Sequence, residues 1–163
     1  ATPLPGFDKL ADERAPPPDW PRFPGRPAAI LVDGWCLGAT RQDPATLAAP
    51  INALEREEDP NAVWRGYADE ALAGRYQAFF GGFDAIVFLA APSFDSVLAW
   101  RCEQEAGLLA MAPGDLPAER RGEIARFIQH FERITRHMLA GGVAATATVA
   151  LDPDRRPGAL PDR

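Results

Sequence analysis

Ala28-Ala29-Ile30-Leu31-Val32, which stops at Asp33-Gly34, is the stretch of sequence that decides the expected fold class. An apolar run of this length without alternation is typical of a strand that is covered on both faces, as strands of a parallel sheet are. Two further runs of the same kind, 85–89 and 147–151, follow later in the chain. Three buried strands separated by helical segments predict an α/β domain with a three-layer parallel sheet and helices on both faces.

Three helical segments separate these runs. The first is expected from Asp59-Pro60, an N-cap followed by proline at the first helical position, to Gly81-Gly82. Ser93 is the expected cap of the second, and the third, over 117–140, has the clearest apolar stripe. Residues 36–58 are expected to form a long loop with a short helix. The aromatic side chains expected in the core of the first helix are Trp64, Tyr67, Phe79 and Phe80.

Composition bounds the function classes. The chain has 163 residues, enough for one compact domain, and its 17 basic against 23 acidic residues give a net charge of -6. This acidic balance argues against a general nucleic-acid binder, which needs a basic field. No apolar run reaches the length of about 18 that a membrane span needs, so we expect no membrane partner. Cys36 and Cys102 are expected as free thiols of a cytoplasmic protein, because no secretory signal precedes them.

Asp33 is the first candidate for chemistry. Ligands of parallel α/β sheets bind beyond the carboxyl ends of the strands, and Asp33 comes directly after the first expected strand. A carboxylate at this position can hold Mg²⁺ or orient an attacking hydroxyl group. The alternative is an aspartate that only caps a loop, and the short motif leaves both open.

Arginines on the third helix form a second group of candidates. Arg126, Arg133 and Arg136 recur at helical spacing, on the face opposite the phenylalanines. Guanidinium groups in such a row can grip phosphate or a carboxylate substrate. The alternative is a solvated helix face with local Glu–Arg pairs.

Two further segments are candidates. Arg101 precedes the Gly- and Pro-containing segment 107–117, a pattern that fits a lid over a nucleotide. The alternative for Arg101 is an intrahelical ion pair with Glu105. A charged cluster lies in the proline-rich, irregular segment 1–27, and irregular segments often carry function. Its members are Asp8, Lys9, Asp12, Glu13 and Arg14.

The first motif also carries a resemblance to a known family. Asp33-Gly34-Trp35-Cys36-Leu37-Gly38 resembles the E-G-W-C-x-G element of the D-glycerate 3-kinase family, a group of P-loop small-molecule kinases related to uridine and pantothenate kinases. Further blocks, over about residues 5–152, resemble the same family in the same order. These blocks are Phe7-Asp8-Lys9 with Asp12 and Arg14, Pro50-Ile51-Asn52-Ala53-Leu54-Glu55, Trp64-Arg65 with Tyr67, Trp100-Arg101 with Gln104-Glu105, and Arg126-Phe127-Ile128-Gln129-His130-Phe131-Glu132-Arg133 with His137.

The resemblance implies ATP-dependent phosphorylation of a hydroxyl group on a small, glycerate-like organic acid, with Mg²⁺. It implies that Asp33 lies near the metal and the acceptor hydroxyl, and that Arg101 is a lid arginine that reaches the phosphates. The other implied phosphate-binding residues are Arg126, Arg133 and Arg136. The residues implied to contact the acceptor are Asp8, Arg14, Trp35, Asn52 and Glu55. Two positions depart from the family pattern: Asp33 is one methylene shorter than the usual Glu, and Asp69 stands where Asn is expected.

The largest departure is the absence of the phosphate-loop motif G-x-x-x-x-G-K-[ST] from the sequence. In the family that loop follows the first strand, which precedes all of these motifs in sequence. In the sheet, that first strand lies between the strand that corresponds to the one ending at Asp33 and the strand that corresponds to the one ending near Leu89. The chain therefore resembles a partial P-loop kinase domain over 1–152, with 1–27 on the acceptor side, a lid region over 98–117 and a flexible tail over 153–163. The alternative is an inactive or split-kinase fragment that binds an anionic metabolite or a partner chain, such as a missing half with the phosphate loop.

Overall fold

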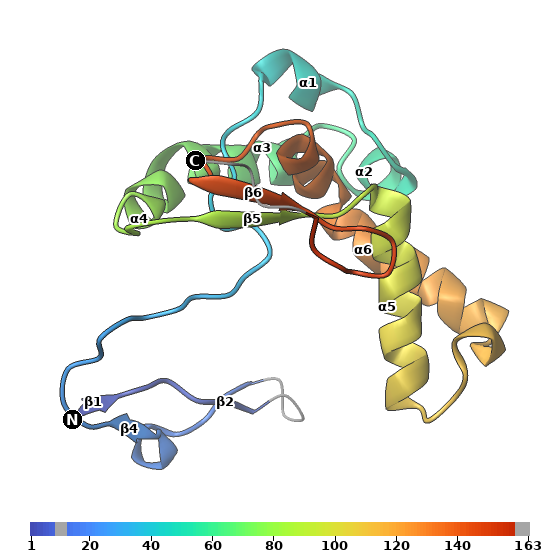
Figure 1. Ribbon diagram of the computed structural model, residues 1–163. Coiled ribbons are helices and arrows are strands. Elements are labelled where there is room, and N and C mark those ends of the chain that lie inside the picture. Colours follow the sequence, from blue (N-terminus) through green and yellow to red (C-terminus); the bar gives the residue numbers. More distant parts are fainter. Residues whose placement is uncertain (9–12, 159–163) are drawn as a thin grey trace. The chain divides into compact units, whose positions relative to one another are not determined.

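The computed structural model describes residues 1–8 and 13–158, and the chain divides into two compact units, Ala1–Asp33 and Gly34–Arg163 (Figure 1). The expected domain over 1–152 thus contains a boundary directly after Asp33. Lys9 and Asp12, two members of the charged cluster, lie outside the described residues.

Two short antiparallel ladders make up the first unit. Their strands are β1 (Thr2–Pro3) with β4 (Arg22–Phe23), and β2 (Phe7–Asp8) with β3 (Glu13–Arg14). A 3-10 turn, η1 (Pro17–Asp19), follows β3, and the Trp20 indole N–H donates to the Ala15 carbonyl at 2.7 Å. The described residues of the segment 1–27 therefore form more regular structure than the irregular chain that its prolines predict.

The apolar run 28–32 forms no strand in the described part of the chain. Its side chains are open to solvent, with Leu31 97% exposed. A strand exists only through hydrogen bonds to a neighbouring strand, and no described residue bonds to the backbone of this run. The prediction of a strand here is wrong, because apolar composition supplies the side chains of a strand but not its partner. The three-layer parallel sheet stays a prediction.

The second unit contains the expected parallel pair (Figure 1). β5 (Val87–Ala90) and β6 (Ala147–Ala150) run parallel, with Val87 opposite Ala147. Three elements connect them: α5 (Phe94–Leu108), the 3-10 turn η3 (Pro113–Asp115) and α6 (Ala118–Leu139). The Ser93 hydroxyl accepts from the Ser96 N–H and caps α5, as the sequence predicts. Both strands and both long helices are confirmed to within three residues.

Residues 36–80 contain more helix than the sequence predicts. The elements are α1 (Pro44–Ala48), α2 (Ala53–Glu58), α3 (Val63–Ala71), the π-helical turn η2 (Leu72–Tyr76) and α4 (Gln77–Phe80). The predicted helix start at Pro60 is wrong, because Asp59 ends α2 and α3 begins at Val63. The Asp59 carboxylate still serves the new helix, since it accepts from the backbone N–H groups of Trp64 and Arg65 at 3.0 and 3.1 Å.

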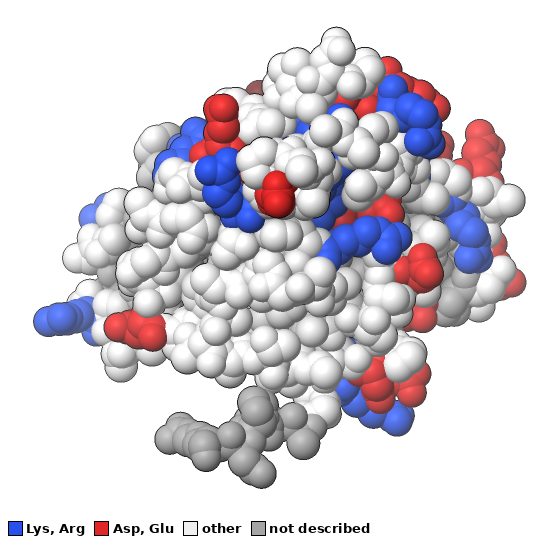
Figure 2. Space-filling view, turned by 90° about the horizontal axis from the view of Figure 1, so that it is seen from above, with Lys and Arg blue, Asp and Glu red and all other residues white. Residues whose placement is uncertain are grey.

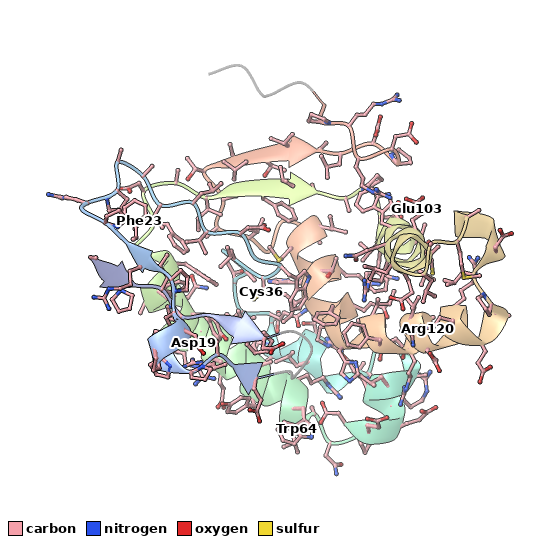
Figure 3. The ribbon with its side chains drawn as sticks, turned by 90° about the horizontal axis from the view of Figure 1, so that it is seen from below. Asp19, Phe23, Cys36, Trp64, Glu103 and Arg120 are labelled. Atoms are coloured by element: carbon pink, nitrogen blue, oxygen red, sulfur yellow. The ribbon has the colours of Figure 1, made fainter. Side chains whose placement is uncertain are left out.

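Two apolar clusters hold the second unit together. The first, between α5 and α6, contains Phe94, Cys102, Ala106, Leu116, Ile124 and Ile128. The second joins helices to β5 and contains Ala39, Leu72, Phe80 and Met138, with Ile86 and Phe88 packed against it. Cys36, labelled in Figure 3, also contacts this second cluster. Both cysteines are free thiols.

The aromatic residues of the helix over 63–80 do not share one face. Phe80 is buried, whereas Trp64, Tyr67 and Phe79 are exposed, so the prediction that all four belong to the core is wrong for three of them. The buried face carries Arg65, Asp69 and Leu72 instead. The spacing of the aromatic residues predicts an apolar inner face. Arg65 and Asp69 take the inner positions instead, because ion pairs satisfy their buried charges.

β5 has one free edge and one open face. Among the described residues it pairs only with β6, and Val87 and Leu89 are 58% and 59% exposed. The far edge of β6 receives the Gly158 N–H on the Ala150 carbonyl. A parallel pair with an uncovered face is unusual, because parallel strands normally have both faces covered.

None of the helices in the described ranges 1–8 and 13–158 has the length and apolarity that crossing a membrane requires.

Neighbouring phenylalanines test the assignment of the core. Phe80 is 4% exposed and Phe79 is 54% exposed. We expect Phe80→Ala to lower the free energy of unfolding by about 3–5 kcal/mol, because it leaves a cavity in the second cluster. Phe79→Ala, the matched control, should lower it by about 1 kcal/mol or less. Urea denaturation followed by circular dichroism measures both, and equal losses would contradict this core.

Candidate functional site

A buried ion pair joins α2 to α6. The Arg133 guanidinium donates to both carboxylate oxygens of Glu55, from Nε at 2.7 Å and from Nη2 at 2.6 Å. Both side chains are buried. Because a buried charge is tolerated only when it is paired and hydrogen-bonded, the bidentate geometry is what allows these residues to lie inside the unit.

The same arginine also satisfies the end of a helix. Arg133 donates to the carbonyls of Thr46 and Ala49, at 3.0 and 2.7 Å. A second buried arginine, Arg65, donates to the two carbonyls between them, those of Leu47 and Ala48, at 2.6 and 3.2 Å. Four consecutive carbonyls at the C-terminal end of α1, which have no partner within that helix, are thus held by two guanidinium groups.

Asn52 fixes the N-terminal end of α2 against α6. Its side-chain oxygen accepts from the Glu55 N–H at 2.9 Å, which makes it the N-cap of α2. Its side-chain N–H₂ donates to the Gln129 carbonyl at 3.0 Å and to Glu132 at 3.1 Å, both on α6. Gln129 returns a bond, because its side-chain oxygen accepts from the Leu54 N–H at 2.8 Å. Segments about 75 residues apart in sequence therefore form one network.

Arg65 has a carboxylate partner of its own. Its guanidinium lies 3.1 Å from Asp59 and also donates to the Asp59 backbone carbonyl. Asp69, one turn after Arg65, accepts from the Gln42 N–H at 2.5 Å and pairs with Arg41 at 3.4 Å. The start of α3 is therefore fixed by charge on its inner face.

These hydrogen bonds and ion pairs lower the pKa values of two carboxyl groups, Glu55 and Asp59. Burial by itself raises the pKa of Glu55, but the hydrogen bonds from Arg133 and the Ile51 N–H, with the nearby positive charges, outweigh it and lower the pKa. For Asp59, burial is again opposed by hydrogen bonds, here from the N–H groups of Trp64 and Arg65, and the pKa is lowered. Both groups are charged at neutral pH.

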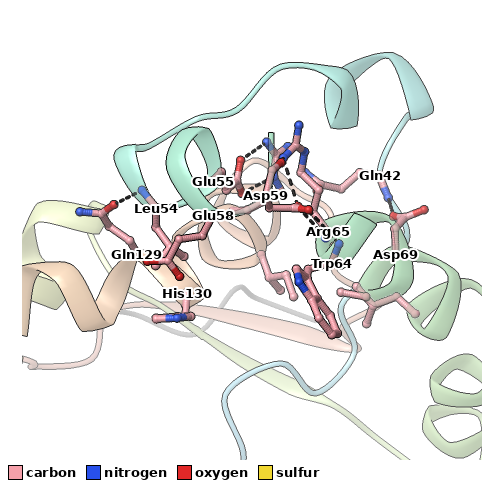
Figure 4. Close-up of a pocket in the computed structure, with 14 residues that line it drawn as sticks. Gln42, Leu54, Glu55, Glu58, Asp59, Trp64, Arg65, Asp69, Gln129 and His130 are labelled. Carbon is pink, nitrogen blue, oxygen red and sulfur yellow. Dashed lines mark hydrogen bonds and ion pairs between the residues drawn. The ribbon is translucent and has the colours of Figure 1, made fainter. Parts of the chain in front are cut away.

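A pocket of about 440 Å³ opens beside this network (Figure 4). Its lining comes from α2, α3 and α6 and from the segments around them. The lining residues are Gln42, Leu54, Glu55, Glu58, Asp59, Trp64, Arg65, Ala68, Asp69, Leu72, Gln129, His130, Arg133 and Ile134. This volume is in the range of sites for small molecules.

The remaining predicted arginines are also paired. Arg126 contacts Glu58 and lies 3.5 Å from Glu57, and its Nη1 is buried without a partner among the described residues. Arg136 donates to Glu132 at 2.8 Å, an i,i+4 pair. The row on α6 is thus no simple solvated face, because Arg133 is internal. The phosphate-binding roles of these residues stay predictions.

Arg101 makes the intrahelical contacts that the alternative reading expects. Its guanidinium donates to Gln104 at 2.6 Å and lies 3.7 Å from Glu105. Glu105 bonds more closely to Arg120, at 2.5 Å. Figure 3 labels Arg120 on α6. Arg101 is therefore held more loosely than Arg133, and its role in a lid stays a prediction.

The expected acceptor and metal residues fall into both units. Asp8, Arg14 and Asp33 belong to the first, where β2 and β3 place Asp8 beside the strand that ends in Arg14. Trp35 belongs to the second, and its indole N–H donates to Thr135 on α6 at 2.9 Å. No cluster of three or more His, Cys, Asp or Glu that suits a metal occurs in the described ranges. Asp33 is an exposed single carboxylate, which fits Mg²⁺ only together with water and nucleotide oxygens.

Of the polar lining residues, Glu55 and Arg133 are predicted site residues, and the other seven are not: Gln42, Glu58, Asp59, Arg65, Asp69, Gln129 and His130. Of these, Asp59 and Asp69 carried a signal. Arg65, Asp69 and Leu72 recur at spacings of four and three, so a polar pair shares a helix face with an apolar residue. Gln42 and His130 show no pattern that distinguishes them from surface residues.

The face of the molecule drawn in Figure 2 has no single basic region. On the face drawn in Figure 2, Lys and Arg side chains alternate with Asp and Glu and do not gather into one basic field.

A scan against protein-family models finds no match, and comparisons with curated proteins and with solved structures also find none. The glycerate-kinase resemblance therefore stays a prediction from the residues quoted for it.

The buried pair of Glu55 and Arg133 predicts that a substitution that removes only one charge lowers the stability of the fold strongly. Glu55→Gln leaves the Arg133 guanidinium buried without its counter-charge, so we expect the free energy of unfolding to fall by about 3–5 kcal/mol. The control is Glu58→Gln, whose carboxylate is exposed and pairs with the half-exposed Arg126, and whose cost should be about 1 kcal/mol or less. Urea denaturation at pH 7 measures both. A loss below that of the control would rule out a structural role for the pair.

The lowered pKa values of Glu55 and Asp59 predict the direction of the pH dependence. The unfolded chain takes up protons on these groups at higher pH than the folded chain does, so their stabilisation is present at neutral pH. It is lost as the pH falls below about 4, the ordinary range of carboxyl groups. Unfolding free energies between neutral pH and pH of about 3 should fall less steeply in Glu55→Gln than in the wild type. Parallel curves would contradict the assignment.

Proposed function

We propose that the chain takes part in ATP-dependent phosphorylation of a hydroxyl group on a small organic acid of the glycerate type. One observation supports this proposal most: four of the six sequence blocks that resemble this kinase family, those that contain Trp35, Asn52 with Glu55, Arg65, and Arg133, are far apart in the chain and are connected around α6 and the end of α1 in the second unit. Trp35 bonds to α6, Asn52 and Glu55 bond to α6, and Arg65 holds the same helix end as Arg133. Segments that belong to one functional core are expected to meet in this way.

The contacts divide the proposed roles. Arg133 and Glu55 satisfy each other, so we assign them to positioning α2 and α6. Arg101, whose nearest carboxylate is 3.7 Å away, has a guanidinium that a phosphate can recruit at small cost. Asp33 would hold Mg²⁺ together with water and ATP oxygens, and would lie near the acceptor hydroxyl group. Catalysis of this kind rests on positioning and on neutralising phosphate charge.

The β- and γ-phosphates need a further component. Backbone N–H groups of a phosphate loop and its lysine normally hold them, and the sequence contains no G-x-x-x-x-G-K-[ST]. The proposal therefore requires a second segment that carries this loop. ATP and Mg²⁺ are the cofactors of the combined protein in this proposal.

A second candidate function is the binding of a partner chain. The free edge of β5 and its exposed Val87 and Leu89 favour it, because such an edge can accept another strand. On this alternative the chain is an inactive or split-kinase component that binds a partner, or an anionic metabolite, without ATP turnover. The two candidates share the partner segment and differ in whether catalysis follows.

A reading of the coding DNA upstream of the Ala1 codon tests the proposal first. An in-frame strand followed by G-x-x-x-x-G-K-[ST] supplies the required segment, and the extended chain is then assayed for ADP formation with D-glycerate and Mg²⁺. Turnover that depends on D-glycerate supports the kinase. A phosphate-loop segment that binds the chain and gives no turnover supports the second candidate. The lack of any such segment in the extended gene or in co-purified partners contradicts the kinase.

Asp33 and Arg101 give the residue-level test in that assay. We expect Asp33→Asn and Arg101→Ala each to lower kcat at least about 100-fold, because each removes a charge that is needed in the transition state. Arg156→Ala, which removes an exposed arginine near the C-terminus, should leave kcat unchanged. Full activity of Arg101→Ala would remove this residue from the lid role, and full activity of Asp33→Asn would remove Asp33 from the metal role.

A further inference from the structure

The pocket beside α3 and α6 has a lining whose charges are already balanced. Four carboxylates line it, and each has a guanidinium partner. The pairs are Glu55 with Arg133, Glu58 with Arg126, Asp59 with Arg65, and Asp69 with Arg41. An anion that entered would have to displace a carboxylate from its arginine, and a cation would have to displace an arginine. Two of these pairs, Glu55–Arg133 and Asp59–Arg65, are buried on both sides, and breaking either one leaves an uncompensated buried charge. The lining therefore favours an uncharged ligand.

The walls of the pocket are mostly apolar. They come from Leu54, Trp64, Ala68, Leu72 and Ile134. Trp64 is 71% exposed, so most of its indole, a broad flat surface, is left uncovered by the described residues. Figure 4 shows Trp64 and His130 on the same side of the ion-paired groups. A flat ring that stacks on this indole would bury apolar area on both partners.

Two polar groups on α6 complete the lining. The oxygen of the Gln129 side chain is used by the Leu54 N–H, whereas its N–H₂ group has no partner among the described residues. Nδ1 of His130 lies 2.9 Å from the Phe127 carbonyl, and because a carbonyl only accepts, Nδ1 carries the proton. Nε2 of the neutral ring is then a free acceptor. Adjacent positions of α6 thus offer one donor and one acceptor.

We propose that this pocket binds an uncharged heteroaromatic compound, of the class to which nucleosides and nicotinamide belong, which stacks on Trp64 and hydrogen-bonds to Gln129 and His130. A ring of this class has apolar faces and an edge with both donors and acceptors, which matches the lining. A sugar matches it less well, because its many hydroxyl groups would lie against Leu54, Leu72 and Ile134 without partners. The inference concerns binding alone and does not depend on the proposed phosphotransferase activity.

Titration of the full chain with adenosine, followed by the indole N–H signals in ¹H–¹⁵N NMR spectra, tests the proposal. The chain has four tryptophans, and the spectrum of Trp64→Phe assigns the signal of Trp64. We expect adenosine to shift this signal with a Kd of about 1 mM or below. Nicotinamide should shift it as well, whereas nicotinate, which has the same ring with a negative charge, should bind at least about tenfold more weakly.

Matched variants separate the pocket from general surface effects. Trp64→Ala should weaken adenosine binding at least about tenfold, measured by calorimetry, because it removes the stacking surface. Tyr67→Ala removes an exposed aromatic one turn away that does not line the pocket, and should change Kd less than about twofold. Trp64→Phe, which keeps a ring, should bind between the wild type and Trp64→Ala.

Three results would overturn the proposal. The first is the absence of any shift of the Trp64 signal with adenosine and nicotinamide. The second is binding of nicotinate as tightly as nicotinamide, because the argument from balanced charge would then fail. The third is a Trp64 signal that responds to glucose and to neither ring compound, which would assign the pocket to sugars.

Discussion

The ion pair between Glu55 and Arg133 is the constraint on which the second unit depends. Burying two charges is costly, and the cost is offset only if nearly every donor and acceptor is used. Here the guanidinium gives two bonds to Glu55 and two to carbonyls near the end of α1, so α1, α2 and α6 are fixed by one side chain. Arg65 of α3 bonds to the same end of α1 in the same way, through the carbonyls of Leu47 and Ala48. The pocket has a defined shape because its polar wall is held in this way.

The sequence predicts those elements whose signal is local. β6 and β5 follow from short β-branched runs, and α5 follows from Ser93 as its cap, because these signals act within a few residues. The run 28–32 shows the limit of such signals. Its composition is that of a strand, but a strand also needs a hydrogen-bonded neighbour, and no described residue provides one. Local sequence can specify a side-chain pattern and cannot specify the partner.

The candidate site is less predictable than the fold for a related reason. The arginines of α6 recur at helical spacing in the sequence, and such spacing predicts an exposed face that binds an anion. Arg133 instead faces inward, because Glu55 and the carbonyls of Thr46 and Ala49 lie within its reach only after folding. Asp59 is similar: it reads as a simple helix cap, and its pairing with Arg65 depends on a turn in which Ala62 adopts a left-handed conformation.

Internal pairing of the arginines also narrows what any catalytic role can be. A guanidinium that is buried between a carboxylate and two carbonyls, as Arg133 is, cannot turn to a phosphate without leaving those groups unsatisfied. In the proposed kinase, charge neutralisation of the transferred phosphoryl group would therefore come from loosely held cations, and Arg101 is the one that the contacts favour among the predicted phosphate-binding arginines. Because the sequence has no phosphate loop, the proposed kinase needs another segment to bring the remaining positive charge. Among the described residues of the second unit, the free edge of β5 is a place where a strand can be added without displacing an existing bond. In the proposed kinase the buried network and the open strand therefore have complementary roles: the network fixes the residues that this chain would contribute, and the strand edge leaves room for the segment that would carry the phosphate loop.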